Sequence, residues 1–140
     1  MSKLERTFAI IKPDAVEAGN AGAIITKIEK SGFRILALRK VHMSRAQAEG
    51  FYAVHRKRPF FSSLVKFMTS GPSIVMALER ENAIAKWRQV MGSTNPAEAA
   101  KGTVRKLYGT NIERNASHGS DAPETASTEL GFFFSAADLL

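Results

Sequence analysis

One short apolar run, TFAII at residues 7–11, constrains the fold more than any other segment. A run of this length without polar alternation is typical of a strand that is covered on both faces. It is followed by Lys12, Pro13 and Asp14, and a proline cannot donate a hydrogen bond within a sheet. We therefore expect a central strand over residues 7–11, with Lys12 at its end.

Helical and extended patterns alternate along the rest of the chain. Apolar residues at helical spacing predict a helix after Asn20 that ends at Gly32. Ser44 and Gln47 have the capping-box pattern of a helix start, and Pro59 is expected to begin another helix. The remaining expected elements are strands over 33–43, with its apolar side chains on one face, and 73–79, helices over 81–91 and 122–130, and a short strand near residue 115.

This order of elements predicts an α+β fold in which one sheet carries helices on a face, in a single domain of residues 1–140. Hydrophobic residues make up 44% of the chain, which is enough to form a core. Residues 92–114 lack a long apolar pattern and are rich in lysine and arginine. We expect them to form a long basic loop before the last strand, and loops of this length are usually functional.

Charge and cysteine content limit the classes of partner and compartment. The chain has no run of about 18 apolar residues that could span a membrane, so we expect no membrane partner. It also has no cysteine and no signal-peptide core near its first residues, so we expect a cytoplasmic protein. A net charge of +7 and a pI near 10.0 predict an anionic partner. Charge alone leaves nucleotides, nucleic acids and acidic lipids open.

The segment NASHGSD at residues 115–121 carries the strongest chemical signal. His118 is followed by Gly119, which has no Cβ and would let an anion approach the backbone beside the imidazole. Asp121, with Glu124 three residues later, predicts a helix N-terminus. Helix N-termini carry free N–H groups and a partial positive charge that suit phosphate. The segment therefore indicates a nucleophilic imidazole at an anion-binding corner.

Four segments together resemble the nucleoside diphosphate kinases, in the order and spacing of that family. They are TFAIIKPDAV at 7–16, RPFF at 58–61, the TNP and GTVR blocks within 94–105, and NASHGSD at 115–121. The resemblance covers essentially the whole chain. It implies a ferredoxin-like βαββαβ sandwich with a four-stranded, mostly antiparallel sheet. It also implies transfer of the γ-phosphate of a nucleoside triphosphate, typically ATP, to a nucleoside diphosphate, by a ping-pong mechanism through a phosphohistidine and with magnesium.

The resemblance assigns catalytic roles to particular residues. His118 matches the phosphate acceptor, and a neutral imidazole is nucleophilic near pH 7. Glu129 matches the carboxylate that orients this imidazole, although its spacing alone also suits a solvated glutamate near a helix end. Ser120 matches the hydroxyl that contacts the site around His118 and Glu129. Lys12 matches a catalytic cation at the phosphates.

Nucleotide binding is expected from a second group of residues. Phosphoryl transfer requires positioning and charge neutralisation more than covalent chemistry. The residues that match the family are Lys12, Arg88 and Arg105 for the phosphates, Tyr52 and Thr94 as further phosphate-contacting hydroxyls, Asn115 for the sugar, and Phe60 for stacking on the base. Few of these residues read the base, so broad base specificity is expected. Without the resemblance, Arg88, Tyr52, Asn115 and Phe60 also suit structural roles, and His42 and His55 are expected to be structural.

Cofactors, assembly and differences from the family complete the expectations. No cluster of histidines, cysteines or carboxylates predicts a protein metal site, so magnesium is expected on the phosphates and water. Family members are tetramers or hexamers, and the apolar segment 132–134 suits an exposed interface. Ala122 stands where the family commonly has serine, and residues 106–108 are bulkier and more basic than usual. The short segment after the last helix resembles bacterial members.

Two other classes of protein compete with the kinase. An RNA-binding module on a ferredoxin-like sheet requires exposed aromatic residues in a basic-Gly-aromatic signature, which this sequence lacks. A histidine phosphocarrier between proteins would not require Lys12, Arg88, Arg105 and Phe60. The charge leaves a secondary nucleic-acid role open, and the sequence leaves open the choice between tetramer and hexamer.

Overall fold

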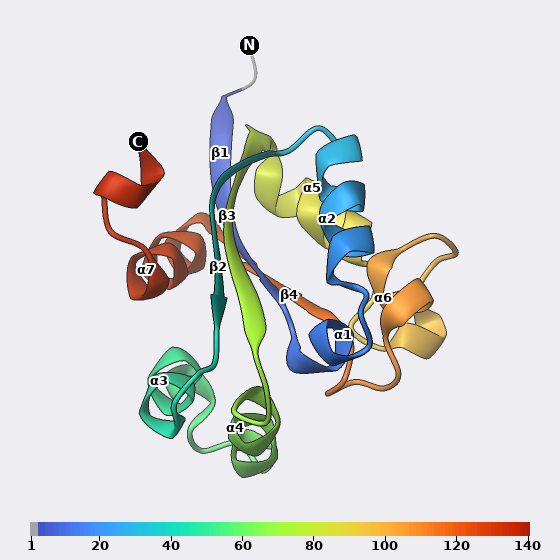
Figure 1. Cartoon of the computed structure of the whole chain (residues 1–140), viewed down its shortest axis with the longest axis vertical. Helices are drawn as coiled ribbons and strands as arrows, with labels where there is room; N and C mark the ends of the chain where they lie inside the picture. Colours follow the sequence, from blue (N-terminus) through green and yellow to red (C-terminus); the bar gives the residue numbers. More distant parts are fainter. Residues whose placement is uncertain (1–2) are drawn as a thin grey trace.

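The computed structural model describes residues 3–140, which form a four-stranded sheet in the order β2-β3-β1-β4 (Figure 1). The strands are β1 (Leu4–Ile11), β2 (Arg34–Val41), β3 (Ser73–Glu81) and β4 (Ser117–Gly119). All neighbouring pairs are antiparallel. This order and direction confirm the predicted ferredoxin-like arrangement.

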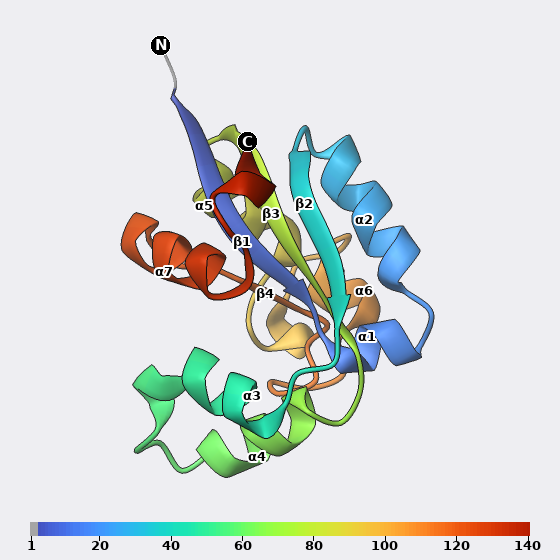
Figure 2. The ribbon, with the colours of Figure 1, turned by 60° about the vertical axis from the view of Figure 1, so that its left-hand side comes forward.

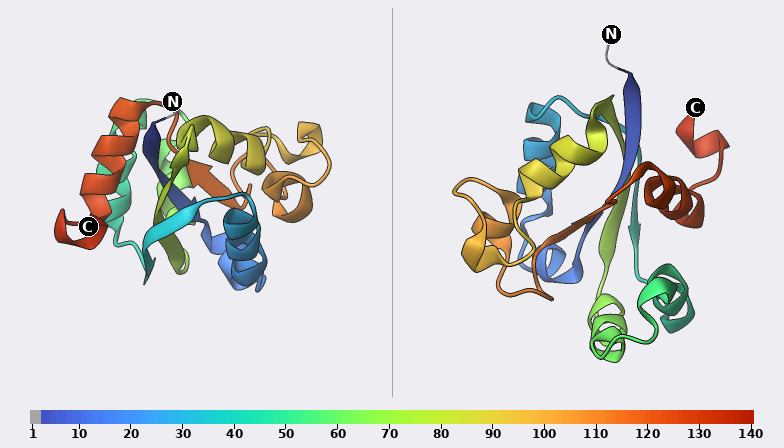
Figure 3. Two further views of the ribbon diagram at one scale, coloured as in Figure 1. Left: turned by 90° about the horizontal axis from the view of Figure 1, so that it is seen from above. Right: turned by 180° about the vertical axis from the view of Figure 1, so that it is seen from behind.

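Helices cover both faces of the sheet, so the expectation of helices on a single face is wrong. One face carries α1 (Pro13–Glu17), α2 (Ala21–Lys30), α5 (Ala83–Met91) and α6 (Val104–Tyr108), and the opposite face carries α3 (Arg45–Phe51), α4 (Phe61–Met68) and α7 (Pro123–Phe133) (Figure 3). Short 3-10 turns occur at Ala53–His55, Pro96–Glu98 and Ala137–Leu139.

Strand β1 lies between two hydrophobic cores, as its apolar run predicted. Phe8 and Ile10 pack in the core under α3, α4 and α7, whereas Ala9 and Ile11 pack in the core under α2 and α5. All of these side chains are completely buried. Side chains alternate between the faces of a strand, so a continuous apolar sequence is the pattern that two covered faces require.

Strand β2 does not keep its apolar residues on one face. Its pairing with β3 is irregular between Ile35 and Ala37. Phe33 and Ile35 pack with the α2 and α5 core, while Ala37 and Met43 pack with the opposite core. A bulge adds a residue to one strand and changes which side chains share a face, so the single predicted face is divided into two.

The predicted helix starts are confirmed in part. Ser44 Oγ accepts from the Gln47 N–H at 3.1 Å and Ser44 N–H donates to Gln47 Oε1 at 2.8 Å, as the capping box predicted. Helix α4 begins at Phe61 rather than at Pro59. The predicted basic loop contains a 3-10 turn and α6, which Thr103 caps by accepting from the Lys106 N–H. The bulky segment 106–108 is therefore helical.

The C-terminal aromatic residues belong mainly to the core. Phe133 and Phe134 are 7% and 6% exposed, and the rings of Phe8 and Phe133 stack with centroids 5.5 Å apart. Only Phe132, at 41%, is exposed. The expectation of an exposed apolar tail is thus wrong for two of its three residues. The chain then turns back, so that its C-terminus lies at the same end of the sheet as the start of β1 (Figure 2).

Candidate functional site

The backbone of His118 is fixed in the sheet. His118 lies in β4, opposite Ile10 of β1, and its carbonyl accepts from Trp87 Nε1 at 3.1 Å. Its imidazole is bordered by aromatic rings, with the Phe51 centroid at 5.5 Å and the Tyr52 centroid at 6.4 Å. The side chain remains 21% exposed. A residue with a rigid backbone and an accessible ring is suited to react with a bound molecule.

Glu129 and Ser120 lie beside this imidazole. His118 Nε2 is 3.0 Å from Glu129 Oε1, and Ser120 Oγ donates to the same oxygen at 2.8 Å. The hydroxyl of Ser120 in turn accepts from the Phe8 N–H at 3.3 Å. An ionised carboxylate only accepts hydrogen bonds, so Nε2 carries the proton and Nδ1 has the free lone pair. The glutamate is not a solvated residue at a helix end, since its side chain is 19% exposed.

Lys12 and Asn115 form a buried polar pair. Lys12 Nζ donates to Asn115 Oδ1 at 2.8 Å, and Asn115 Nδ2 donates to the Thr94 carbonyl at 3.1 Å. Lys12 is 7% exposed and Asn115 is 2% exposed. Burial, together with the positive charge of Arg105, lowers the pKa of Lys12 to about 8. A buried cation of this kind gains stability when an anion binds beside it.

Arg105 is the second buried cation. Its NH1 donates to the Gly92 carbonyl at 3.1 Å and its NH2 to the Ser117 carbonyl at 2.9 Å. Burial, with a smaller effect of the Arg88 charge, lowers the pKa of Arg105 to about 10. Among residues 3–140, no carboxylate lies within 4.0 Å of the cationic groups of Lys12, Arg88 or Arg105. These cations therefore form no ion pair within the described chain, although Asp14 and Glu113 act on Lys12 from a greater distance.

Two adjoining clefts meet at His118. One, of about 430 Å³, is lined by Arg88, Thr94, Arg105 and Gly119, and the other, of about 480 Å³, by Lys12, Tyr52, Phe60, Asn115 and Glu129. Thr94, Arg105 and His118 line both. The two clefts thus contain all the predicted site residues except Ser120. Ser120 lines neither cleft but is joined to the site by its hydrogen bond to Glu129.

The larger cleft also contains residues that the sequence did not indicate. His55, expected to be structural, lines this cleft with its ring 5.4 Å from that of Phe60. Ile112 lines it as well and is 61% exposed. Phe60 is 47% exposed, so it is not a core residue. His42, by contrast, has the structural contact expected of it, with Nε2 2.8 Å from the Thr69 carbonyl.

Tyr52 lines the same cleft and carries a buried hydroxyl. The residue is 6% exposed, and its OH has no hydrogen-bond partner within residues 3–140. Burial and the nearby charge of Glu129 raise the pKa of Tyr52 above its usual value. The group therefore remains a neutral hydroxyl that has a donor to offer but no partner within residues 3–140.

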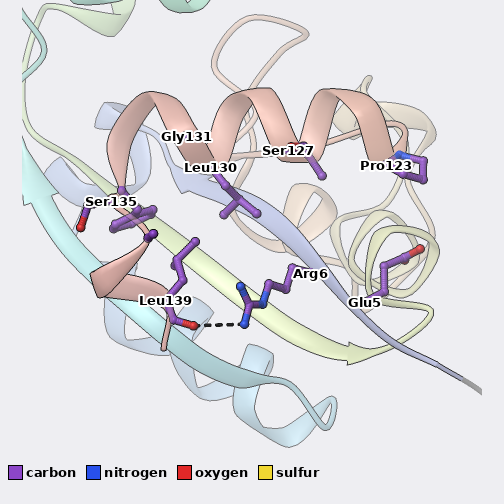
Figure 4. Close-up of a pocket in the computed structure, with 11 residues that line it drawn as sticks. Glu5, Arg6, Pro123, Ser127, Leu130, Gly131, Ser135 and Leu139 are labelled. Atoms are coloured by element: carbon purple, nitrogen blue, oxygen red, sulfur yellow. Dashed lines mark hydrogen bonds between the residues drawn. The ribbon is translucent and has the colours of Figure 1, made fainter.

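The anion-binding corner is not built as the sequence predicted. A Cβ on Gly119 would lie 2.5 Å from Trp87 Cδ1, so this glycine makes room for the indole ring. The cap of α7 is Ala122, whose N–H donates to Thr125 Oγ1 at 3.0 Å, and not Asp121. The first residue of α7, Pro123, lines a different cleft (Figure 4). Side-chain cations, rather than a helix start, supply the positive charge beside His118.

The cleft in Figure 4 has a volume of about 450 Å³ and lies between α7, the start of β1 and the C-terminal turn. Arg6 closes part of it by donating to the Leu139 carbonyl at 3.1 Å. None of the predicted site residues lines this cleft. It is therefore separate from the His118 site.

The described residues hold no preformed metal site and no membrane span. Across residues 3–140, no three histidine, cysteine or carboxylate side chains are grouped so that they could hold a metal ion. In the same part of the chain, no helix is both long and apolar enough to cross a bilayer.

Comparison with known proteins decides the family. The family model described as nucleoside diphosphate kinase matches residues 5–139. The chain belongs to the nucleoside diphosphate kinase family. Its sequence is 62% identical to the nucleoside diphosphate kinase of Trichlorobacter lovleyi, over 98% of this chain and 99% of the relative. It is 57% identical to that of Geobacter sulfurreducens, over 98% of this chain and the full length of the relative.

Solved structures of nucleoside diphosphate kinases have the same fold. The Aquifex aeolicus enzyme matches with a TM-score of 0.96 and 42% identity, over 99% of this chain and 100% of the other. The Halobacterium salinarum enzyme, solved in complex with CDP, matches with a TM-score of 0.94 and 37% identity, over 99% of this chain and 92% of the other. The chain is thus an enzyme that transfers phosphate from nucleoside triphosphates to nucleoside diphosphates.

Membership in the nucleoside diphosphate kinase family also decides between the competing classes. The chain is neither an RNA-binding module nor a protein-to-protein phosphocarrier in its main function. Phe8, the aromatic residue of β1, is completely buried and offers no stacking surface. The family uses a divalent cation in catalysis.

Proposed function

We propose that Nδ1 of His118 is the atom that receives the phosphoryl group. The observation that supports this is the bond between Nε2 and Glu129, because it leaves the Nδ1 lone pair free. The lone pair attacks the γ-phosphorus, the bond to the β-γ bridging oxygen breaks, and the nucleoside diphosphate leaves with those electrons. A β-phosphate oxygen of a second diphosphate then attacks phosphorus, and the P–N electrons return to Nδ1.

Glu129 and Ser120 act through the imidazole. When Nδ1 bonds to phosphorus, the ring becomes cationic while Nε2 keeps its proton. The negative charge of Glu129 at 3.0 Å stabilises that cation. Ser120 holds the carboxylate in place by donating to the same oxygen. Ser120 is therefore a positioning residue, and Glu129 orients the nucleophile and compensates its charge.

The phosphates bind to the cations that form no ion pair in the described chain. Lys12 supplies a compact point charge, whereas Arg88 and Arg105 supply planar forks. Two N–H groups of Arg105 already donate to the carbonyls of Gly92 and Ser117. These bonds fix the plane of its guanidinium before a nucleotide binds. Preorganised charge of this kind stabilises the transition state without rearrangement during the reaction.

Tyr52, Thr94, Asn115 and Phe60 complete nucleotide binding. The unpaired hydroxyl of Tyr52 and the hydroxyl of Thr94 donate to phosphate oxygens, and Asn115 bonds the sugar. Phe60 stacks on the base at the exposed mouth of the cleft. An aromatic ring can stack on any base, and Phe60 is the one residue assigned to the base. This supports broad base specificity.

Magnesium is the divalent cation that we propose. The described chain has no cluster of ligands for it, which fits an ion that binds the phosphate oxygens and water. When bound, it neutralises phosphate charge. Lys12, Arg88 and Arg105 contribute to the same neutralisation from the protein.

We propose further that residues 1–140 act as one domain, in the cytoplasm, as a homotetramer or homohexamer. Both cores share the same sheet, which supports a single unit. The outer edge of β2 has no strand partner among residues 3–140, and Leu38 on it is 43% exposed. Edge strands of this kind favour pairing with another chain. A secondary nucleic-acid role has the net charge of +7 as its only support.

The test of the proposed function uses ATP labelled at the γ-phosphate. The protein is incubated with the labelled ATP and magnesium, and the phosphoprotein is isolated before and after addition of a mixture of diphosphates. We expect an acid-labile, alkali-stable phosphoprotein that passes its label to diphosphates of several bases. In His118→Ala the label is expected to be absent, whereas in the matched control His42→Ala it is expected to persist. A labelled His118→Ala, or acid-stable label on Ser120, would overturn the proposal.

A further inference from the structure

A strained backbone turn separates two residues of the site. Ala116 has φ of +74°, in the left-handed region that residues with a Cβ rarely adopt. The Ser117 N–H donates to the Asn115 carbonyl at 2.9 Å, which closes a three-residue γ-turn around Ala116. A γ-turn with positive φ is rare and strained. Such a conformation persists only where surrounding contacts hold it.

The contacts that hold this turn come from the segment after β1. The Ala116 N–H donates to Asp14 Oδ2 at 3.1 Å, and the Lys12 N–H donates to the Ala116 carbonyl at 2.9 Å. Both polar backbone groups of Ala116 are thus bonded to the turn of residues 12–14. Ala116 itself is completely buried. Of these two bonds, only the one that the Asp14 carboxylate accepts depends on a side chain.

The turn determines how the two parts of the site face each other. Asn115, before it, bonds to Lys12 Nζ and to the Thr94 carbonyl. Ser117, after it, starts β4 and gives its carbonyl to Arg105, and His118 follows. A change of backbone direction at Ala116 would move the sugar and phosphate ligands relative to the nucleophile. Displacements of about 1 Å can reduce rates about 100-fold.

We infer that Asp14 is a positioning residue for phosphoryl transfer, which holds the γ-turn at Ala116 and thereby sets His118 relative to Lys12 and Asn115. The inference rests on the role proposed above for His118. Asp14 does not line either cleft at His118, so it acts through the backbone and not on the nucleotide. Its own place is fixed because it lies in the first turn of α1, directly after β1.

The experiment measures single-turnover phosphorylation of His118 by ATP, together with steady-state kcat and KM, in four variants. Asp14→Ala removes the acceptor, and we expect a rate of phosphorylation that is lower by about tenfold to 100-fold. Asp14→Asn keeps an oxygen that can accept from Ala116, and we expect it to recover most of the lost rate. The matched control is Asp138→Ala, which removes a similar bond from an aspartate to a backbone N–H, that of Ser135 at 2.8 Å, away from the site.

The fourth variant tests the turn itself. Glycine adopts positive φ without strain, so Asp14→Ala combined with Ala116→Gly should be faster than Asp14→Ala alone. This double variant also replaces Asp14→Ala if the single variant does not fold. A merely structural role of Asp14 would lower the melting temperature without this pattern of rescue. The amide proton resonance of Ala116, followed by NMR, should move in Asp14→Asn because its acceptor loses charge.

The results distinguish this inference from the proposed function. Rates for Asp14→Ala equal to those of Asp138→Ala would overturn the positioning role while leaving His118 as nucleophile. Equal defects in Asp14→Ala, Asp14→Asn and the double variant would also overturn it, since charge and not the turn would then matter. Label that persists in His118→Ala would instead show that the proposed nucleophile is wrong.

Discussion

Nε2 of His118 and Oε1 of Glu129 lie 3.0 Å apart, and this contact determines which imidazole nitrogen is free. The two residues come from different elements, β4 and α7, and their side chains are only partly exposed. A carboxylate in partial burial interacts with a cationic ring more strongly than it would in water. The contact therefore affects both the orientation of the His118 ring and the charge of the proposed nucleophile.

Replacing Glu129 with glutamine should separate these two effects. Glu129→Gln keeps an oxygen that can accept from Nε2 but loses the negative charge. We expect the rate of His118 phosphorylation to fall about 100-fold, the scale of removing one preorganised electrostatic group. Rapid-quench measurement with labelled ATP checks this. An unchanged rate would show that the charge of Glu129 does not act on the transition state.

Arg105 is expected to be irreplaceable by lysine. Its guanidinium bonds two backbone carbonyls, those of Gly92 and Ser117, while it lines both clefts. A lysine has a single ammonium group and cannot keep this fork. We expect Arg105→Lys and Arg105→Ala each to lower kcat about 100-fold or more, with smaller changes in KM. Steady-state kinetics measures both.

Lys106→Ala is the matched control for this prediction, because Lys106 is the neighbouring cation in α6 and is exposed. It should retain the kcat of the unmodified chain. A change confined to KM in the Arg105 variants would mean that Arg105 only tethers the nucleotide.

Local sequence patterns predicted the parts of the fold that depend on neighbouring residues. The apolar run 7–11 predicted a strand covered on both faces, because successive side chains of a strand point to opposite faces. Ser44 with Gln47 predicted a helix cap, because the two residues bond to each other's backbone within one turn. The segment around His118 indicated anion chemistry, but the expected helix cap at Asp121 was wrong. The helix is capped at Ala122, whose N–H donates to Thr125 Oγ1. The sequence offers several polar side chains near this helix start and does not show which of them accepts the bond.

Contacts between distant segments explain what the sequence did not show. The space at Gly119 is required by Trp87, which lies on α5, and the turn at Ala116 depends on Asp14. Phe133 is buried against Phe8 of β1 and Phe51 of α3. His55 faces the cleft because the 3-10 turn Ala53–His55 brings it beside Phe60. Each of these roles depends on tertiary packing, which periodicity does not encode.

Nucleotide binding should take up a proton near pH 8. Burial lowers the pKa of Lys12 to about 8 in the free protein, and a bound phosphate raises it by favouring the charged form. At pH 8, about half a proton per site should be taken up, and little at pH 6, where Lys12 is already charged. Calorimetry in two buffers of different ionisation enthalpy measures this uptake. Lys12→Met should lose it, and uptake that persists in this variant would assign the proton to another group.

The same shift predicts a contribution of Lys12 to stability. In the unfolded chain the pKa of a lysine is near 10.5, so between about pH 8 and pH 10.5 the unfolded state binds more protons than the folded state. The free energy of unfolding should rise with pH across this interval through Lys12 alone. Comparing urea unfolding of the unmodified chain with Lys12→Met at pH 7 and pH 10 isolates this effect. An equal pH dependence in both would contradict the lowered pKa.

Base specificity should depend on Phe60. Phe60 is 47% exposed and lines the larger cleft together with Ile112. An aromatic face stacks on any base, with more contact for a purine than for a pyrimidine. We expect values of kcat/KM for purine and pyrimidine diphosphates to differ by about tenfold to 100-fold. Phe60→Ala should narrow this difference while the rate of phosphoryl transfer at saturation stays within a few fold, because Phe60 is assigned to the base and not to the phosphates.

Competition between GDP and CDP for the labelled phosphoprotein measures this ratio directly. Leu107→Ala is the matched control, since Leu107 is an exposed apolar residue, 54% accessible, that lines neither cleft at His118. It should leave the ratio unchanged. A preference for a single base above about 10⁴-fold would require a polar group left unpaired by the other bases, and would contradict stacking as the basis of recognition.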